Sequence, residues 1–131
     1  MITQLHLKSF KSWRDTEAMR FASLTGFFGA NSSGKTSILQ FLMMMKQTTE
    51  SLDRSRVLHT GGDRDSYVDL GTFYDLVHNH QLPGQITFAL EWNCKVEFGE
   101  KSGDRLRLEV ATEGDAKAVW TREFIYTISM G

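Results

Sequence analysis

The sequence predicts an α/β fold that joins a strand–loop–helix unit to an antiparallel β-meander. Two patterns carry this prediction. Residues 21–46 run from an apolar stretch through a glycine-bearing loop into an apolar helix. Beyond residue 85, apolar and polar residues alternate with period two in runs separated by turn residues. We expect strands, loop and first helix within 1–50, a polar loop and short helix within 51–84, and the antiparallel β-subdomain within 85–131.

The first part of the chain predicts three strands. Residues 2–8 form the first, with Leu5 and Leu7 on one face. Residues 9–15 break the alternation and predict a turn. A second short strand is expected over 16–21, and the apolar stretch 21–28 predicts a buried strand that leads into the glycine-bearing loop.

The loop matches G-x-x-x-x-G-K-[ST], the phosphate-binding loop, without a mismatch. Gly29 and Gly34 lack a Cβ, so the backbone can turn tightly and approach phosphate oxygens. Lys35 would reach the β- and γ-phosphates, and the Thr36 hydroxyl would ligate Mg²⁺. The predicted triphosphate site comprises Gly29, Ala30, Asn31, Ser32, Ser33, Gly34, Lys35, Thr36 and Ser37.

A helix is expected over residues 37–46. It is apolar nearly all round, which predicts a fully buried helix, and its three methionines are interpreted as core residues. Residues 48–65 predict a solvated loop and 67–70 a short extended piece. A short helix is expected over 71–78, where Thr72 and Asp75 have capping-box spacing.

The end of that short helix carries the sequence His78-Asn79-His80. We interpret it as a helix end before Pro83-Gly84 and not as a metal or nuclease element, because no third ligand is nearby. The meander then follows in four alternating runs, over 86–92, 95–98, 105–110 and 117–129. Turn residues at 99–104 and 112–115 separate them.

Composition narrows the class of protein. The 131 residues have a formal net charge of −1, so no overall basic field points to nucleic acid. The lone Cys94 excludes an internal disulfide and fits a reducing compartment. Residues 1–20 contain no signal peptide, and the longest apolar run, 41–45, is far too short to span a membrane. We therefore expect a cytoplasmic protein without a membrane segment.

The phosphate loop has no acidic partner in this sequence. Nucleotidases with this loop need a second motif, an apolar strand that ends in Asp or Asp-Glu, to hold Mg²⁺ and orient water. No run of that kind follows the loop, and the run 123–129 leads directly to the last residues. We expect the chain to be the first part of a larger protein.

The order of these features resembles the amino-terminal half of an ABC-type ATPase head. Residues 7–13, Leu-Lys-Ser-Phe-Lys-Ser-Trp, resemble the "L-x-x-F-K-S" opening of the SMC/RecF/OLD branch. The loop is similar to that branch's G-x-N-x-[SA]-G-K-[ST] variant. Residues 67–80 look like a segment that recurs in prokaryotic OLD-like AAA family ATPases, many of them encoded in anti-phage defence operons. The resemblance covers residues 1–80.

This resemblance implies a first lobe of an ABC-type head that binds ATP and Mg²⁺, with Lys35 as the catalytic lysine and Thr36 on the metal. It also places Lys11, Ser12 and Trp13 beside the nucleotide. In the full-length ATPase, ATP would join two heads into a homodimer, and hydrolysis would be coupled to DNA processing or phage defence, with an attached or partner nuclease. Without the second and signature motifs, this chain alone is expected to hold ATP weakly and not to hydrolyse it.

Two alternatives remain open. A P-loop kinase or GTPase of another branch is the first, although such kinases begin almost at the loop. None of the three asparagines is followed by the lysine of a guanine-reading N-K-x-D. A non-catalytic interaction module with a vestigial loop is the second, although the intact Lys35 and Thr36 argue against decay of the loop.

Overall fold

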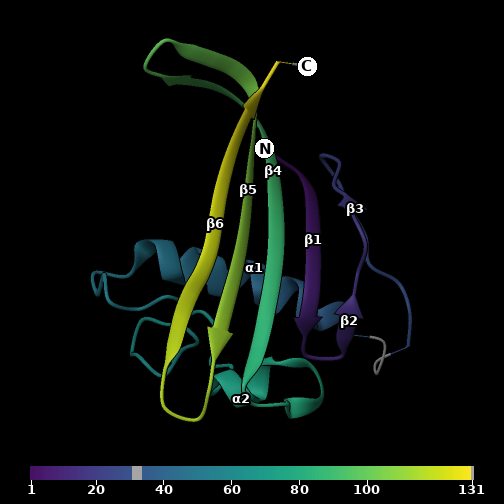
Figure 1. The fold of residues 1–131 in the computed structure, drawn as a ribbon. Coiled ribbons are helices and arrows are strands. Elements are labelled where there is room, and N and C mark those ends of the chain that lie inside the picture. Colours follow the sequence, from purple (N-terminus) through teal and green to yellow (C-terminus); the bar gives the residue numbers. More distant parts are fainter. Residues whose placement is uncertain (31–33, 131) are drawn as a thin grey trace.

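The fold is built on a six-stranded sheet whose strand pairs are all antiparallel. The computed structural model describes residues 1–30 and 34–130. Five strands lie in the order β2–β1–β4–β5–β6, and β3 pairs with β1 (Figure 1). Their bounds are β1 Ile2–Phe10, β2 Trp13–Asp15, β3 Met19–Arg20, β4 Gly84–Phe98, β5 Lys101–Gly114 and β6 Val119–Ser129.

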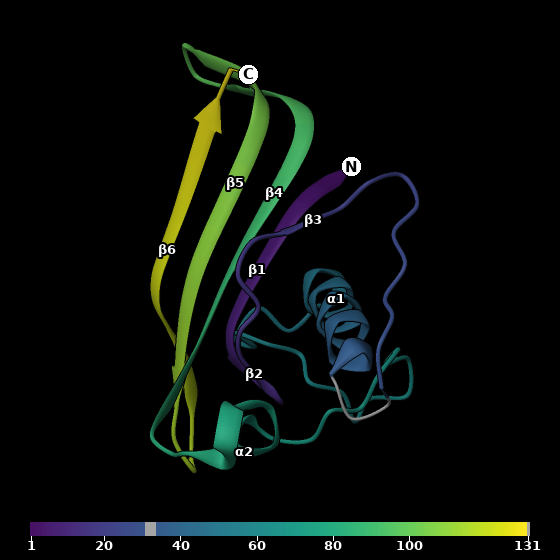
Figure 2. The same cartoon turned by 90° about the vertical axis from the view of Figure 1, so that its right-hand side faces the viewer.

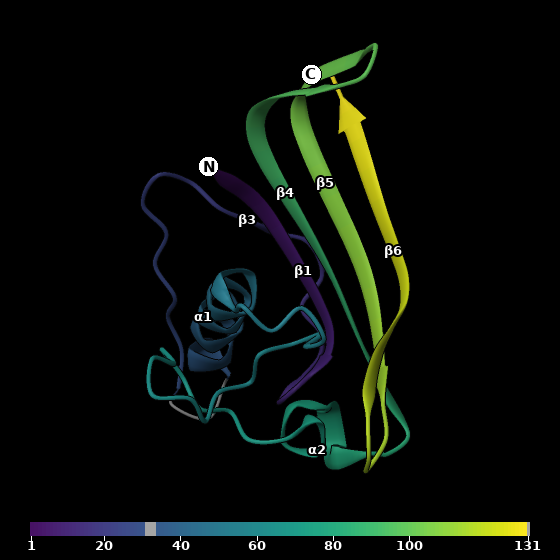
Figure 3. The same cartoon turned by 90° about the vertical axis from the view of Figure 1, so that its left-hand side faces the viewer.

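Helix α1, Lys35–Glu50, packs across one face of this sheet (Figures 2 and 3). The Phe41 ring sits edge-on between Phe10 and Phe88, with ring centroids 5.4 Å and 5.2 Å away. Burying one such side chain contributes about 2–3 kcal/mol. The remaining core is formed by apolar side chains of β1, α1, β4 and the segment after α1, among them Leu5, Leu7, Ile38, Met44, Leu76, Ile86 and Leu90.

Two short helical turns lie at one end of the sheet. Helix α2, Phe73–Leu76, is followed by the 3₁₀ turn η1, His78–His80. The expected capping box is present, and the Thr72 N–H donates to the Asp75 carboxylate at 2.8 Å. Val77 bridges to Phe10 of β1, which fastens this segment to the sheet. In the part of the chain that the structure describes, no helix is long and apolar enough to cross a membrane.

The predicted antiparallel meander is confirmed, but its strands are longer and its turns shorter than expected. Strand β5 includes residues 101–104 and 112–114, which were expected in turns, because residues of both stretches pair with β4. The runs expected over 86–92 and 95–98 belong to one strand, β4, because the register shift between Asn93 and Val96 absorbs the irregular residues. The tip of the β4–β5 hairpin bends away from the rest of the sheet (Figure 1). Because β4 also pairs with β1, the first strand and the meander form one continuous sheet.

The outer strand β6 carries several large side chains that remain largely exposed. Phe124 and Tyr126 are 57% and 56% exposed, and their rings pack edge-to-face on each other. Phe124 pairs with Val110 of β5 and Tyr126 with Leu108, so these four side chains lie on the same face of the sheet. Helix α1 lies over the β1–β4 side of this face (Figure 2), so the apolar side chains of β5 and β6 continue the face past the helix.

The buried strand expected over residues 21–28 is not found. This segment is irregular, and Leu24 and Phe28 are 92% and 94% exposed. A strand needs a neighbour to accept its backbone hydrogen bonds, and among the described residues no strand pairs with this segment. Its apolar composition alone therefore does not make it a strand.

The turn expected over residues 9–15 and the strand expected over 16–21 are also corrected. Strand β1 continues to Phe10, and β2 begins at Trp13, so the turn is only two residues long. Within 16–21 only β3 is a strand. The pairing of β2 back onto β1 overrides the loss of alternation, because backbone hydrogen bonds do not depend on side-chain pattern.

Helix α1 is longer than expected and is not buried all round. Its buried positions, among them Ile38, Phe41 and Met44, follow one stripe, whereas Leu39 is 51% exposed. The reason is geometric, since the sheet covers one side of α1 and leaves the position of Leu39 exposed. Residues 67–70, expected as a short extended piece, pair with no described strand, and the N–H groups of Tyr67 and Val68 donate to Gln47 of α1.

Candidate functional site

The candidate site lies where α1 begins. Gly34 is the N-cap residue of α1 and has φ +83°, a left-handed conformation that favours glycine. The Lys35 ammonium donates to the Gly29 carbonyl at 2.7 Å, which joins the first turn of α1 to Gly29. The predicted site residues Asn31, Ser32 and Ser33 lie outside the described residues.

Gly34 has no room for a side chain. A Cβ at this position would stand 2.3 Å from Ser12 Oγ and 2.8 Å from Trp13 Nε1. The Trp13 indole N–H donates to the Gly34 carbonyl at 2.9 Å. The structure therefore brings Ser12 and Trp13, from the β1–β2 hairpin, into contact with the end of the phosphate loop, and the requirement for glycine at this position has a steric cause.

Lys11 points from the same hairpin toward α1. Its ammonium donates to Gln40 Oε1 at 2.8 Å. Burial lowers the pKa of Lys11, and the charge of Asp75 opposes that shift. Lys11 has φ +51°, and its backbone N–H donates to the Leu76 carbonyl at 2.6 Å. A positive φ is uncommon for lysine, and here it occurs directly before Ser12 and Trp13, which contact Gly34.

The described residues fit a magnesium-bound polyphosphate. They supply a lysine ammonium, the first turn of a 16-residue helix and the hydroxyl of Thr36, which lies on the exposed side of that turn. Ser37 is buried, and its N–H turns back to the Gly34 carbonyl at 3.1 Å. Within 1–30 and 34–130, no group of three His, Cys, Asp or Glu side chains could hold a metal without the nucleotide.

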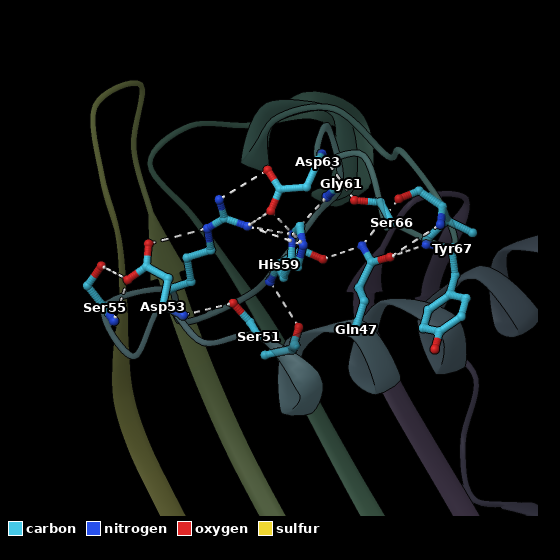
Figure 4. Close-up of polar contacts among 12 residues, drawn as sticks. Gln47, Ser51, Asp53, Ser55, His59, Gly61, Asp63, Ser66 and Tyr67 are labelled. Carbon is cyan, nitrogen blue, oxygen red and sulfur yellow. Dashed lines mark hydrogen bonds and ion pairs between the residues drawn. The ribbon is translucent and has the colours of Figure 1, made fainter.

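A second polar cluster lies at the other end of α1 (Figure 4). Gln47, which is 3% exposed, donates to the His59 and Val68 carbonyls at 2.6 Å and 3.2 Å. Its Oε1 accepts from the N–H groups of Tyr67 and Val68 at 3.0 Å and 3.2 Å. One side chain thus fastens the loop of residues 51–70 to α1. Sequence reasoning missed Gln47, because no motif marks a glutamine that bonds to backbone.

Charged groups extend that cluster toward solvent. Arg56 donates to Asp63 Oδ2 at 2.7 Å, and its Nε lies 3.5 Å from Asp53 (Figure 4). The hydrogen bond from Arg56 lowers the pKa of Asp63. His59 Nε2 lies 3.2 Å from the same carboxylate. These pairs tie the loop to itself and do not face the phosphate loop's end of α1.

Comparisons with known proteins agree on the class of domain. A family model described as "AAA ATPase domain" matches residues 1–112. The chromosome partition protein Smc of Methanococcus voltae is 27% identical over 88 residues, which are 63% of this chain and 7% of that protein. The chain therefore spans a small part of this relative's length.

A solved structure shares the fold. It comes from work on the ATP-driven dimerization and DNA-stimulated activation of SMC ATPases, and it superposes with a TM-score of 0.51 at 18% identity. The match covers 92% of this chain and 69% of that one. The two chains thus share the arrangement of sheet and helix described above.

Proposed function

The chain belongs to the AAA ATPase domain family, and from this premise we propose that residues 29–37 bind the triphosphate of ATP together with Mg²⁺. The observation that carries the proposal is the packing at Gly34, where the β1–β2 hairpin closes on the loop and leaves space for backbone only. Lys35 would leave the Gly29 carbonyl for the phosphates, and Thr36 would face the metal. In the full-length protein, hydrolysis would remove the γ-phosphate of the bound ATP.

The hairpin residues complete the proposed site. Ser12 and Trp13 already contact Gly34, and Lys11 reaches Gln40 of α1. We assign them to the wall beside the nucleotide, with Lys11 as a second positive charge near the phosphates. Burial disfavours the charged form of Lys11 and so lowers its pKa. A phosphate bound nearby would stabilise the charged ammonium, so anion binding and protonation of Lys11 would favour each other.

The proposal for the full-length protein is an OLD-like ATPase of the cytoplasm. Two such heads would close on ATP as a homodimer, and hydrolysis would separate them and drive DNA processing in phage defence, with an attached or partner nuclease. The SMC neighbour, described by ATP-driven dimerization and DNA-stimulated activation, supports the dimer and the DNA. The resemblance of residues 67–80 to OLD-like proteins supports the rest. Contacts to the γ-phosphate exist only before hydrolysis, so they would favour the joined heads over the separated ones until ATP is hydrolysed.

The test is calorimetric titration of the full-length protein with ATP and Mg²⁺. Lys35→Ala should weaken ATP binding by about 100-fold or more, because charge-assisted hydrogen bonds to phosphate contribute roughly 1.5–3 kcal/mol each. Lys46→Ala, on the exposed side of the same helix, should leave the affinity unchanged. Equal affinity of the wild type and Lys35→Ala would refute the site.

Two further titrations separate the alternatives. Preference for GTP over ATP would favour a GTPase of another branch. Failure of the wild type to bind any nucleotide would favour an interaction module with a vestigial loop.

The role of Thr36 in binding the metal has its own test. Thr36→Ala should remove most of the gain in ATP affinity that Mg²⁺ brings, while ATP affinity measured with a chelator stays as in the wild type.

A further inference from the structure

The hairpin between β1 and β2 holds Lys11 in a conformation that lysine rarely adopts. Phe10 pairs with Trp13, so Lys11 and Ser12 form a two-residue loop, and Lys11 has φ +51°. Loops of this length favour glycine or asparagine at positive φ, because a Cβ there is crowded. Contacts from elsewhere in the fold must therefore stabilise the turn.

Those contacts come from residues 76–78. The Lys11 N–H donates to the Leu76 carbonyl at 2.6 Å, and the Lys11 carbonyl lies 2.7 Å from His78 Nδ1. A carbonyl can only accept, so His78 Nδ1 carries the proton in this contact. One short segment thus satisfies both backbone polar groups of the residue at positive φ.

The segment is a firm support. Leu76 and Val77 are 0% and 3% exposed, and Val77 bridges to Phe10. Helix α2, just before it, is closed by the capping box of Thr72 and Asp75. His78 therefore donates from a segment whose own position is fixed by the core and by β1, 67 residues along the chain from the lysine that it holds.

We propose that His78 is a positioning residue for nucleotide binding. Its Nδ1–H holds the Lys11 carbonyl, so that the Lys11 side chain reaches Gln40 of α1 and the next two residues of the hairpin close on Gly34. The inference rests on the proposed ATP site and adds to it a residue outside both the loop and the hairpin. What it requires at residue 78 is a donor at the δ position, and a charge is not required.

The test compares two variants of similar size in the full-length protein. His78→Asn keeps a donor, because its amide nitrogen is as many bonds from Cα as Nδ1 is. His78→Asp has only acceptors, which would face the Lys11 carbonyl. We expect ATP affinity within about twofold of the wild type for His78→Asn and about five- to tenfold weaker for His78→Asp. In steady-state ATPase assays, KM should rise for His78→Asp more than kcat falls.

A neighbouring histidine provides the matched control. His80 Nδ1 bonds to the Tyr74 carbonyl at 2.7 Å and belongs to the same 3₁₀ turn, but it does not contact Lys11. His80→Asp should therefore leave the ATP affinity within about twofold of the wild type. Weakening by His80→Asp equal to that by His78→Asp would overturn the proposal, because it would mean that any disturbance of the turn acts alike.

Lys35→Ala, titrated alongside, separates this inference from the proposed function. If the wild type does not bind ATP, or Lys35→Ala binds equally well, the ATP site itself is wrong. If the wild type binds and Lys35→Ala does not, equal affinities of His78→Asn and His78→Asp overturn the role of His78 alone. Should His78→Asp fail to fold by circular dichroism, His78→Leu takes its place with the same expected loss.

Discussion

Replacing Gln47 with methionine should release the loop of residues 51–70 from α1. Methionine has nearly the same length and volume, so the change removes the four hydrogen bonds of the amide and little packing. Each buried backbone group left without a partner costs about 1–3 kcal/mol, but water can reach part of the loop once it loosens. We therefore expect local opening of the loop to become easier by about 3 kcal/mol in total.

Hydrogen–deuterium exchange measures this local free energy directly. About 3 kcal/mol corresponds to exchange faster by roughly 100-fold, since 1.4 kcal/mol is tenfold. The informative amides are those that do not bond to Gln47 itself. The Leu70 N–H donates to the Thr60 carbonyl at 2.7 Å, and the His59 N–H donates to Thr48 Oγ1 at 2.9 Å. Both should exchange faster only if the whole loop opens.

The control introduces the same side chain on the same helix. Thr49→Met places methionine at an exposed position two residues along α1 and should leave the exchange of Leu70 and His59 unchanged. Unchanged protection of these two amides in Gln47→Met would refute the reasoning, since other contacts with α1, such as that of the Tyr67 hydroxyl with Glu50, would then be holding the loop without the glutamine.

Two further predictions follow from the structure. Gly34→Ala should weaken ATP binding by about tenfold or more, because the added Cβ would lie 2.3 Å from Ser12 Oγ and φ at this residue is +83°. Calorimetry should show partial recovery of the affinity when Ser12→Ala is added. No recovery would contradict the steric cause. The backbone and side-chain hydrogen bonds from Thr72 lower the pKa of Asp75 below its ordinary 3.8, so its contribution to helix α2 is complete above that pH and is lost as the pH falls through the lowered pKa. Exchange of the Thr72 amide, corrected for the intrinsic rate, should therefore rise below about pH 4 in the wild type. In Asp75→Asn it should not vary with pH over this range, because the amide oxygen accepts the hydrogen bond without titrating. A flat wild-type profile would contradict this.

The start of α1 and the meander were predictable because their signals are local. Spacing alone places Gly34 and Lys35 at the start of a helix, and alternation alone assigns Ile86, Phe88 and Leu90 to one face. In both cases the residue pattern reports a backbone geometry that needs no knowledge of distant neighbours. The capping box at Thr72 was predictable for the same reason.

The failures involve partners that the sequence does not reveal. The apolar residues 21–28 look like a strand, but a strand exists only beside another one. The all-round apolar helix α1 meets one sheet face, so Leu39 stays exposed. The roles of Gln47 and His78 depend on backbone carbonyls 12 or more residues away, and carbonyls are identical at every position of a sequence.

The exposed aromatic side chains of β6 have a practical consequence for anyone who expresses these residues alone. Strand β6 is the last strand of the described sheet, so it presents one row of backbone donors and acceptors to solvent beside Phe124 and Tyr126. Such an edge is a template for pairing with a second chain. We expect residues 1–131 in isolation to self-associate with rising concentration, so light scattering belongs beside every titration made on that fragment.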